Sequence, residues 1–222
     1  MKFGVIRFPG SCDETDAVLA CERVPGSSAT VLWHGDADLH GVDAVVVPGG
    51  FSYGDYLRVG AIARFSPVME SVIRFSREGG FVLGICNGFQ VLCEAGLLPG
   101  ALLPNDGLRF LCRQVDLEVV RASMPFTADC APGERLSIPV KHTTGRYYAP
   151  PGDLESLHAH GQIVLKYAAG HNPNGSLDDI AGVTNENGNV LGLMPHPEHA
   201  VDALTGSRDG LKIFLSMAHA HG

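Results

Sequence analysis

The first half of the chain alternates between short apolar runs and segments with helical periodicity. Four apolar runs have the length of a strand: 3–8, 29–33, 43–48 and 81–85. Three segments have the pattern of a helix: 13–24, part of 61–80 and 87–96. Pro67 is expected to mark a start or a kink in the second of these helices. Strands and helices that alternate with short connections predict a parallel, doubly wound sheet.

After residue 97 the pattern changes to alternating apolar and polar positions, which is typical of strands with one solvated face. Five segments are expected to be strands: 114–119, 135–140, 161–168, 179–185 and 189–195. Asn187-Gly188, between the last two, favours a two-residue hairpin turn. An amphipathic helix is expected at 209–220. We therefore predict a single α/β domain over residues 1–222, with a mixed, mostly parallel central sheet flanked by helices and antiparallel additions from the second half.

The composition changes this picture only by excluding classes of protein. Hydrophobic residues make up 45% of the chain and charged residues 18%, as in globular proteins with a substantial core. The net charge of −8 argues against nucleic-acid binding. Without a leader or a long apolar segment, we expect a cytoplasmic protein that does not contact a membrane. Its six cysteines are expected to be reduced. The sequence has no C-x-x-C pair, the common spacing of a structural zinc site.

One cysteine lies between two glycines where a predicted strand meets a predicted helix. The stretch FVLGICNGFQ (81–90) places Cys86 in G-x-C-x-G, the cysteine analogue of a nucleophile elbow. Such a strained turn requires neighbours without side chains at positions 84 and 88. The helix that starts at Asn87 favours a thiolate, and the Asn87 N–H is placed to donate to an oxyanion. The alternative is that the glycines only allow close packing of strand and helix.

A second segment supplies a base and a carboxylate for such a nucleophile. The stretch LGLMPHPEHAVD (191–202) ends a strand and delivers His196 and Glu198, which project to the same side if the chain is extended. A cysteine nucleophile needs a base, and the base benefits from a carboxylate that orients its ring. We therefore predict a triad of Cys86, His196 and Glu198. The alternatives are a surface loop, or a metal site at His196 and His199, for which no third ligand has suggestive spacing.

A third segment breaks a buried strand with Pro-Gly-Gly, in VVVPGGFSYGDYLR (45–58). This break leaves backbone N–H groups facing the space above the sheet, as a second oxyanion donor requires, and Gly50 is the better candidate. The alternative is an ordinary glycine turn. Because the three segments fit one chemistry, they jointly predict a cysteine-dependent acyl-transfer site.

These motifs resemble the class I (triad-type) glutamine amidotransferases, most closely the glutaminase subunits of phosphoribosylformylglycinamidine synthases of purine biosynthesis. Four segments carry the resemblance: 48–69, 82–102, 171–206 and, more weakly, 138–150. G-x-C-x-G alone marks only the broad superfamily, whereas GGFSYGDYLR, CNGFQ and NPNGS before MPHPE are much more specific. The resemblance implies a flavodoxin-like α/β fold. It also implies a glutaminase without a metal in this chain.

In such a glutaminase, Cys86 attacks the side-chain amide of glutamine and His196 protonates the leaving ammonia. Water then hydrolyses the glutamyl thioester. The resemblance implies an oxyanion hole at Gly50 and Asn87. The resemblance further implies that Phe51 and Gln90 lie beside the substrate.

The resemblance also implies partners. Ammonia would pass to a large synthetase subunit, accompanied by a small third subunit, and that synthetase would use ATP and magnesium to form formylglycinamidine ribonucleotide. This chain has no phosphate-binding loop, and we expect no cofactor in it. Where the family usually has His-Gly-Glu-Gly-Arg-Tyr, residues 142–147 read HTTGRY, so a glutamate that contacts the partner or orders the site rim would be missing. Alternative functions are the glutaminase of another amidotransferase, a free-standing γ-glutamyl hydrolase, or a redox sensor, which has no need of His196 and Glu198.

Overall fold

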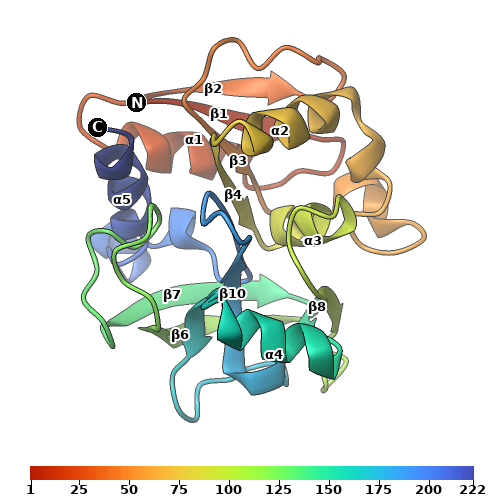
Figure 1. Cartoon of the computed structure of the whole chain (residues 1–222), viewed down its shortest axis with the longest axis vertical. Coiled ribbons are helices and arrows are strands. Elements are labelled where there is room, and N and C mark those ends of the chain that lie inside the picture. Colours follow the sequence, from red (N-terminus) through yellow and green to blue (C-terminus); the bar gives the residue numbers. More distant parts are fainter.

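A nine-stranded mixed sheet with helices on both faces dominates the computed structural model, which describes residues 1–222 (Figure 1). The strand order is β2-β1-β3-β4-β11-β10-β9-β6-β7. The strands are β1 Lys2–Arg7, β2 Ser28–Trp33, β3 Ala44–Val47, β4 Phe81–Ile85, β6 Leu111–Val119, β7 Arg135–His142, β9 Ile163–Tyr167, β10 Ile180–Thr184 and β11 Val190–Leu193. A separate two-stranded sheet pairs β5 (Ala101–Pro104) with β8 (Thr144–Tyr148). The predicted α/β fold class is confirmed.

The parallel part of the sheet contains β2, β1, β3, β4 and β11, and the other strands add to it in antiparallel pairs. The helices are α1 Glu14–Glu22, α2 Pro67–Arg77, α3 Asn87–Glu94, α4 Pro151–Ala159 and α5 Leu211–His221. In Figure 1, α1 and α5 lie on one side of the parallel strands, and α2 and α3 lie on the other. None of these helices has the length and hydropathy that a membrane span requires. Although β11 belongs to the second half of the chain, it lies parallel beside β4, and this return brings two distant segments together.

The pattern of apolar positions predicted most elements to within one to three residues at each end, but it missed β5, β8 and α4. The helix α4 buries only Leu157, so it has no apolar stripe from which a helix could be predicted. The antiparallel pairing of β10 with β11 agrees with the predicted hairpin, but the two-residue turn was wrong. The connection is longer and consists of residues 185–189. The Asn185 side chain holds it closed, because its Oδ1 accepts hydrogen bonds from the N–H groups of Asn189 and Val190.

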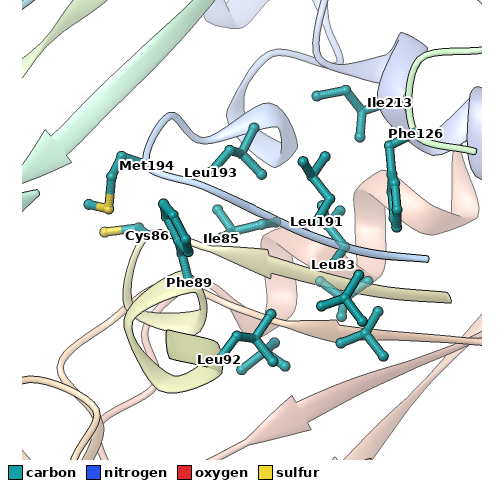
Figure 2. Close-up of a cluster of buried hydrophobic side chains, with 14 of the residues drawn as sticks. Leu83, Ile85, Cys86, Phe89, Leu92, Phe126, Leu191, Leu193, Met194 and Ile213 are labelled. Carbon is teal, nitrogen blue, oxygen red and sulfur yellow. The ribbon is translucent and has the colours of Figure 1, made fainter. Parts of the chain in front are cut away.

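The core follows the central strands to the point where β4 ends. The register pairs Ile85 with Leu193, so the ends of β4 and β11 lie level with each other. Figure 2 shows Cys86 and Met194 at one end of a buried apolar cluster, with Phe126 at the other end. The thiol therefore lies at the boundary between the apolar core and the polar side chains at the ends of β4 and β11.

Candidate active site at the carboxyl ends of β4 and β11

The turn from β4 into α3 holds Cys86 in a strained conformation. Cys86 has φ 50° and ψ −103°, a backbone state that residues with side chains rarely adopt. A Cβ on Gly84 would lie 2.9 Å from the Gly88 carbonyl carbon, and a Cβ on Gly88 would lie 1.8 Å from the carbonyl oxygen of Val47. Both positions therefore require glycine, and the tight turn projects the cysteine from the end of the sheet.

The neighbouring strand β11 brings His196 to the same edge. The Cys86 N–H donates to the Leu193 carbonyl at 2.8 Å, which fixes the start of the elbow against the segment that leads to His196. His196 is fully buried, and its Nδ1 lies 2.6 Å from Glu198 Oε1. Its Nε2 has no hydrogen-bond partner in the protein. The ring is thus oriented by a carboxylate at one nitrogen, which leaves the other nitrogen available for proton transfer.

The backbone between His196 and Glu198 differs from the sequence prediction. Residues Pro197–His199 form a short 3-10 turn, η4, so the predicted extended conformation of this segment was wrong. The turn still brings the two side chains into contact because it folds Glu198 back toward the imidazole ring. Burial by itself lowers the pKa of His196, but the charge of Glu198 and the interaction with Cys86 outweigh burial and raise that pKa above its ordinary value. The electrostatics therefore favour a histidine that holds a proton beside the thiol.

Two backbone N–H groups near the thiol have no acceptor in the protein. Phe51 N–H donates to Gly10 O at 2.9 Å, whereas the N–H of Gly50 donates to nothing. A Cβ on Gly50 would lie 2.6 Å from Gly10 O, and the residue has φ 143°, so only glycine fits there. Asn87 is the first residue of α3, where no intrahelical acceptor exists for its N–H. Both groups are therefore available for a developing negative charge.

The side chain of Asn87 links three segments around the site. Its Oδ1 accepts from the Ser52 N–H at 3.0 Å, and its Nδ2 donates to Gln90 Oε1 at 3.0 Å. Gln90 Nε2 in turn donates to the Thr144 carbonyl at 2.6 Å. The sequence indicated a role only for the Asn87 backbone, but the side chain also ties the loop after Gly50 to the elbow helix and to β8.

Two cavities meet at the cysteine and share part of their walls. Residues of both walls are Gly50, Phe51, Cys86, Phe110 and Lys141. One cavity of 160 Å³ extends toward Asp55, Gln90 and residues 142–144. The other, of 230 Å³, extends toward Cys12, Asp13 and His196. Phe51 and Gln90, both predicted beside the substrate, thus line a cavity that Cys86 also lines.

The structure adds Asp13 and Lys141 to the residues near His196. Asp13 is buried, its Oδ1 accepts from Lys141 Nζ at 2.5 Å, and its Oδ2 lies 3.6 Å from His196 Nδ1. Burial would raise the pKa of Asp13, but the contact with His199 Nε2 at 3.4 Å, the hydrogen bond from Lys141 and the charge of His196 reverse this effect and hold it well below its ordinary value. The sequence offered no signal for this role because Asp13 looked like an acidic residue in the first turn of a helix.

The ligand atoms of four residues near the thiol lie within 4.8 Å of one another: Asp13, His196, Glu198 and His199. The sequence offered only the two histidines as metal ligands, and the fold supplies two carboxylates beside them. A cation at this position would have to displace the Lys141 ammonium from Asp13 and break the contact of His196 with Glu198. The existing contacts favour a network for proton transfer over a metal centre.

Comparison with known proteins agrees with this geometry. Residues 1–212 match the model of the CobB/CobQ-like glutamine amidotransferase domain. A protein of Rubrobacter xylanophilus named phosphoribosylformylglycinamidine synthase subunit PurQ is 60% identical over 217 residues, covering 98% of this chain and 97% of its own length. A Thermus thermophilus protein of the same name is 54% identical, with coverage of 98% and 97%.

Solved structures show the same relationship. A chain in the structure of PurLQS from Thermotoga maritima matches with a TM-score of 0.91 and 41% identity, over 100% of this chain and 99% of that chain. A glutamine amidotransferase from the same organism matches with a TM-score of 0.64 at 15% identity, which shows a shared fold alone. The resemblance of the sequence to class I glutamine amidotransferases is confirmed, and the chain belongs to the family of the CobB/CobQ-like glutamine amidotransferase domain.

Proposed function

We propose that this chain is the glutaminase subunit of a phosphoribosylformylglycinamidine synthase, with Cys86 as the nucleophile, His196 as the proton carrier and Glu198 as the residue that orients it. The observation that carries the proposal is the juxtaposition of the strained Cys86 elbow with a His196–Glu198 pair at 2.6 Å. Identities of 54% to 60% over nearly the whole chain to proteins named PurQ support the assignment to this synthase.

In the first step, the proton of the Cys86 thiol passes to His196, and the sulfur attacks the side-chain carbonyl carbon of glutamine. The carbonyl oxygen takes the negative charge and accepts hydrogen bonds from the N–H groups of Gly50 and Asn87. When the C–N bond breaks, the proton held by His196 passes to the nitrogen, and ammonia leaves with a glutamyl thioester on Cys86. His196 then takes a proton from water, the hydroxyl attacks the thioester, and glutamate leaves as the thiol is restored.

We further propose that the ammonia is used by a large synthetase subunit that binds ATP and magnesium, in a complex with a small third subunit. The match to a chain of the Thermotoga maritima PurLQS structure supports a complex of this kind. Phe51 and Phe110 are exposed apolar side chains that line both cavities, and they support a docking surface there. The six free cysteines support a cytoplasmic location. Contact between α1 and α5 supports one domain over residues 1–222.

The segment that departs from the family pattern forms a wall of the site. His142 is buried, and burial lowers its pKa to about 4, so it is neutral at neutral pH. Its Nδ1 lies 3.0 Å from Asn105 Oδ1, and the carbonyl of Thr144 accepts from Gln90. We propose that backbone groups of this segment order the rim of the site, which would make the glutamate of the usual family pattern unnecessary for that purpose.

The test replaces Cys86 with alanine and compares the chain with and without its synthetase subunits. Glutamate release from glutamine should be abolished in Cys86→Ala, while the complex should still form the amidine product when an ammonium salt is supplied. Wild-type glutamate release should rise strongly when the synthetase subunits and their substrates are added. Rapid glutamine hydrolysis whose rate does not change when the synthetase is added would support a free-standing hydrolase instead. A Cys86→Ala variant with full activity would refute the role of Cys86 as the nucleophile.

A further inference from the structure

One carboxylate borders the cavity of Cys86 without a partner. Asp55 lies in the wall of the 160 Å³ cavity, and its Oδ1 is shielded from solvent with no hydrogen-bond donor in the protein. Burial raises the pKa of Asp55 to about 6, and no charged neighbour offsets this effect. Unsatisfied buried polar atoms are rare in native proteins and require an explanation.

The loop around Asp55 is held in a strained conformation. Tyr53, Asp55 and Leu57 have φ of 54°, 55° and 70°, in the left-handed region that side chains disfavour. The loop is nevertheless anchored, since the Tyr53 hydroxyl lies 2.7 Å from His34 Nδ1 and 2.9 Å from Ser66 Oγ. The surrounding structure thus maintains a costly backbone state that places a carboxylate at the cavity wall.

In the proposed reaction, the attacked carbon lies at Cys86, where the two cavities meet, so each cavity receives a different part of the substrate. Ammonia and water both exchange protons with His196, which borders the 230 Å³ cavity. The carbon chain of glutamine leads away from the leaving nitrogen, so it enters the other cavity, toward Gln90 and Asp55. Its far end carries an ammonium and a carboxylate group. Asp55 is the only acidic residue in the wall of that cavity, so the ammonium finds its complementary charge there.

We propose that Asp55 binds the α-ammonium group of glutamine and makes the site selective for amino-acid amides over amides that lack this group; this inference rests on the proposed glutaminase function. The substrate supplies the countercharge that Asp55 lacks in the protein. An amide without the ammonium would leave the shielded Oδ1 of Asp55 unpaired, and a site built to pair such an atom discriminates against analogues of this kind.

The experiment measures how fast Cys86 is labelled in Asp55→Asn, with mass spectrometry to identify the modified residue. Asparagine keeps the size of the side chain and tolerates the left-handed backbone, so the substitution removes chiefly the charge. The probes are 6-diazo-5-oxo-L-norleucine, which mimics glutamine, its analogue without the α-amino group, and iodoacetamide. The matched control is Asp178→Asn, which has φ 52° and lies outside both cavities.

The wild type and the control should be labelled roughly 10- to 100-fold faster by the amino probe than by its des-amino analogue, in line with one charge-assisted hydrogen bond. Asp55→Asn should lose this preference, with unchanged rates for the analogue and for iodoacetamide. A variant that keeps the preference, or one that reacts more slowly with all three probes alike, would overturn the role of Asp55. If the amino probe labels other thiols in the wild type but not Cys86, the glutaminase proposal itself fails, and the role of Asp55 fails with it.

Discussion

The contact between Gly88 and β3 makes a sharp prediction about the elbow. In Gly88→Ala the new Cβ would lie 1.8 Å from the Val47 carbonyl oxygen, whereas ordinary contacts begin at 3.4 Å. Helix α3 must therefore shift from β3 by about 1.6 Å, the difference of these two distances, because a backbone oxygen cannot rotate away. Overpacking of this kind costs about 1–3 kcal/mol, and a displacement of ~1 Å in a catalytic group lowers rates by roughly 100-fold.

Gly152→Ala is the matched control, because Gly152 is the second residue of α4 as Gly88 is of α3. A Cβ on Gly152 meets nothing within 4 Å, so this variant should gain up to about 1 kcal/mol from helix propensity alone. The free energy of unfolding is measured by urea denaturation, and the geometry of the elbow by the labelling rate of Cys86 with the glutamine-like diazo-ketone. We expect Gly88→Ala to be less stable by about 1–3 kcal/mol and to be labelled much more slowly. Wild-type stability together with wild-type labelling in Gly88→Ala would show that the steric account of the elbow is wrong.

Two further predictions concern the groups that carry protons. Glu198→Gln should lower kcat for glutamine hydrolysis by roughly 100-fold or more with little change in KM, because the imidazolium of His196 loses its carboxylate. An equal loss in Glu186→Gln, an exposed residue of the 185–189 connection, would contradict this. His142 has a folded-state pKa of about 4 against an ordinary value of 6.5, so it contributes stability that is present above pH 6.5 and lost as the pH falls toward 4. The free energy of unfolding should therefore fall by roughly 3 kcal/mol more over this interval in the wild type than in His142→Gln, as 2.5 pKa units at about 1.36 kcal/mol each imply. The exposed His219→Gln should leave that pH dependence unchanged.

Much of the site could be predicted because its chemistry is local in the sequence. The elbow is built from residues 84–88, and its glycines, its cysteine and the following helix are all contiguous. The His196–Glu198 contact also lies within three residues, so the pair was predicted although the backbone argument for it was wrong. The parallel strands were predicted for the same reason, because β3 and β4 are buried almost throughout and read as continuous apolar runs.

The remaining features depend on contacts between distant parts of the chain. Asp13 and Lys141 are 128 positions apart, and only the approach of β7 to the start of α1 pairs their charges beside His196. Asp55 lies in the GGFSYGDYLR stretch, but nothing in that stretch indicates a role for its carboxylate, and the cavity that it borders is formed by segments from residue 50 to residue 144. Sequence by itself determined which groups could react, since residue type and local spacing set that chemistry. Only the tertiary structure decided which charges surround them, because burial and pairing arise when separate segments pack together.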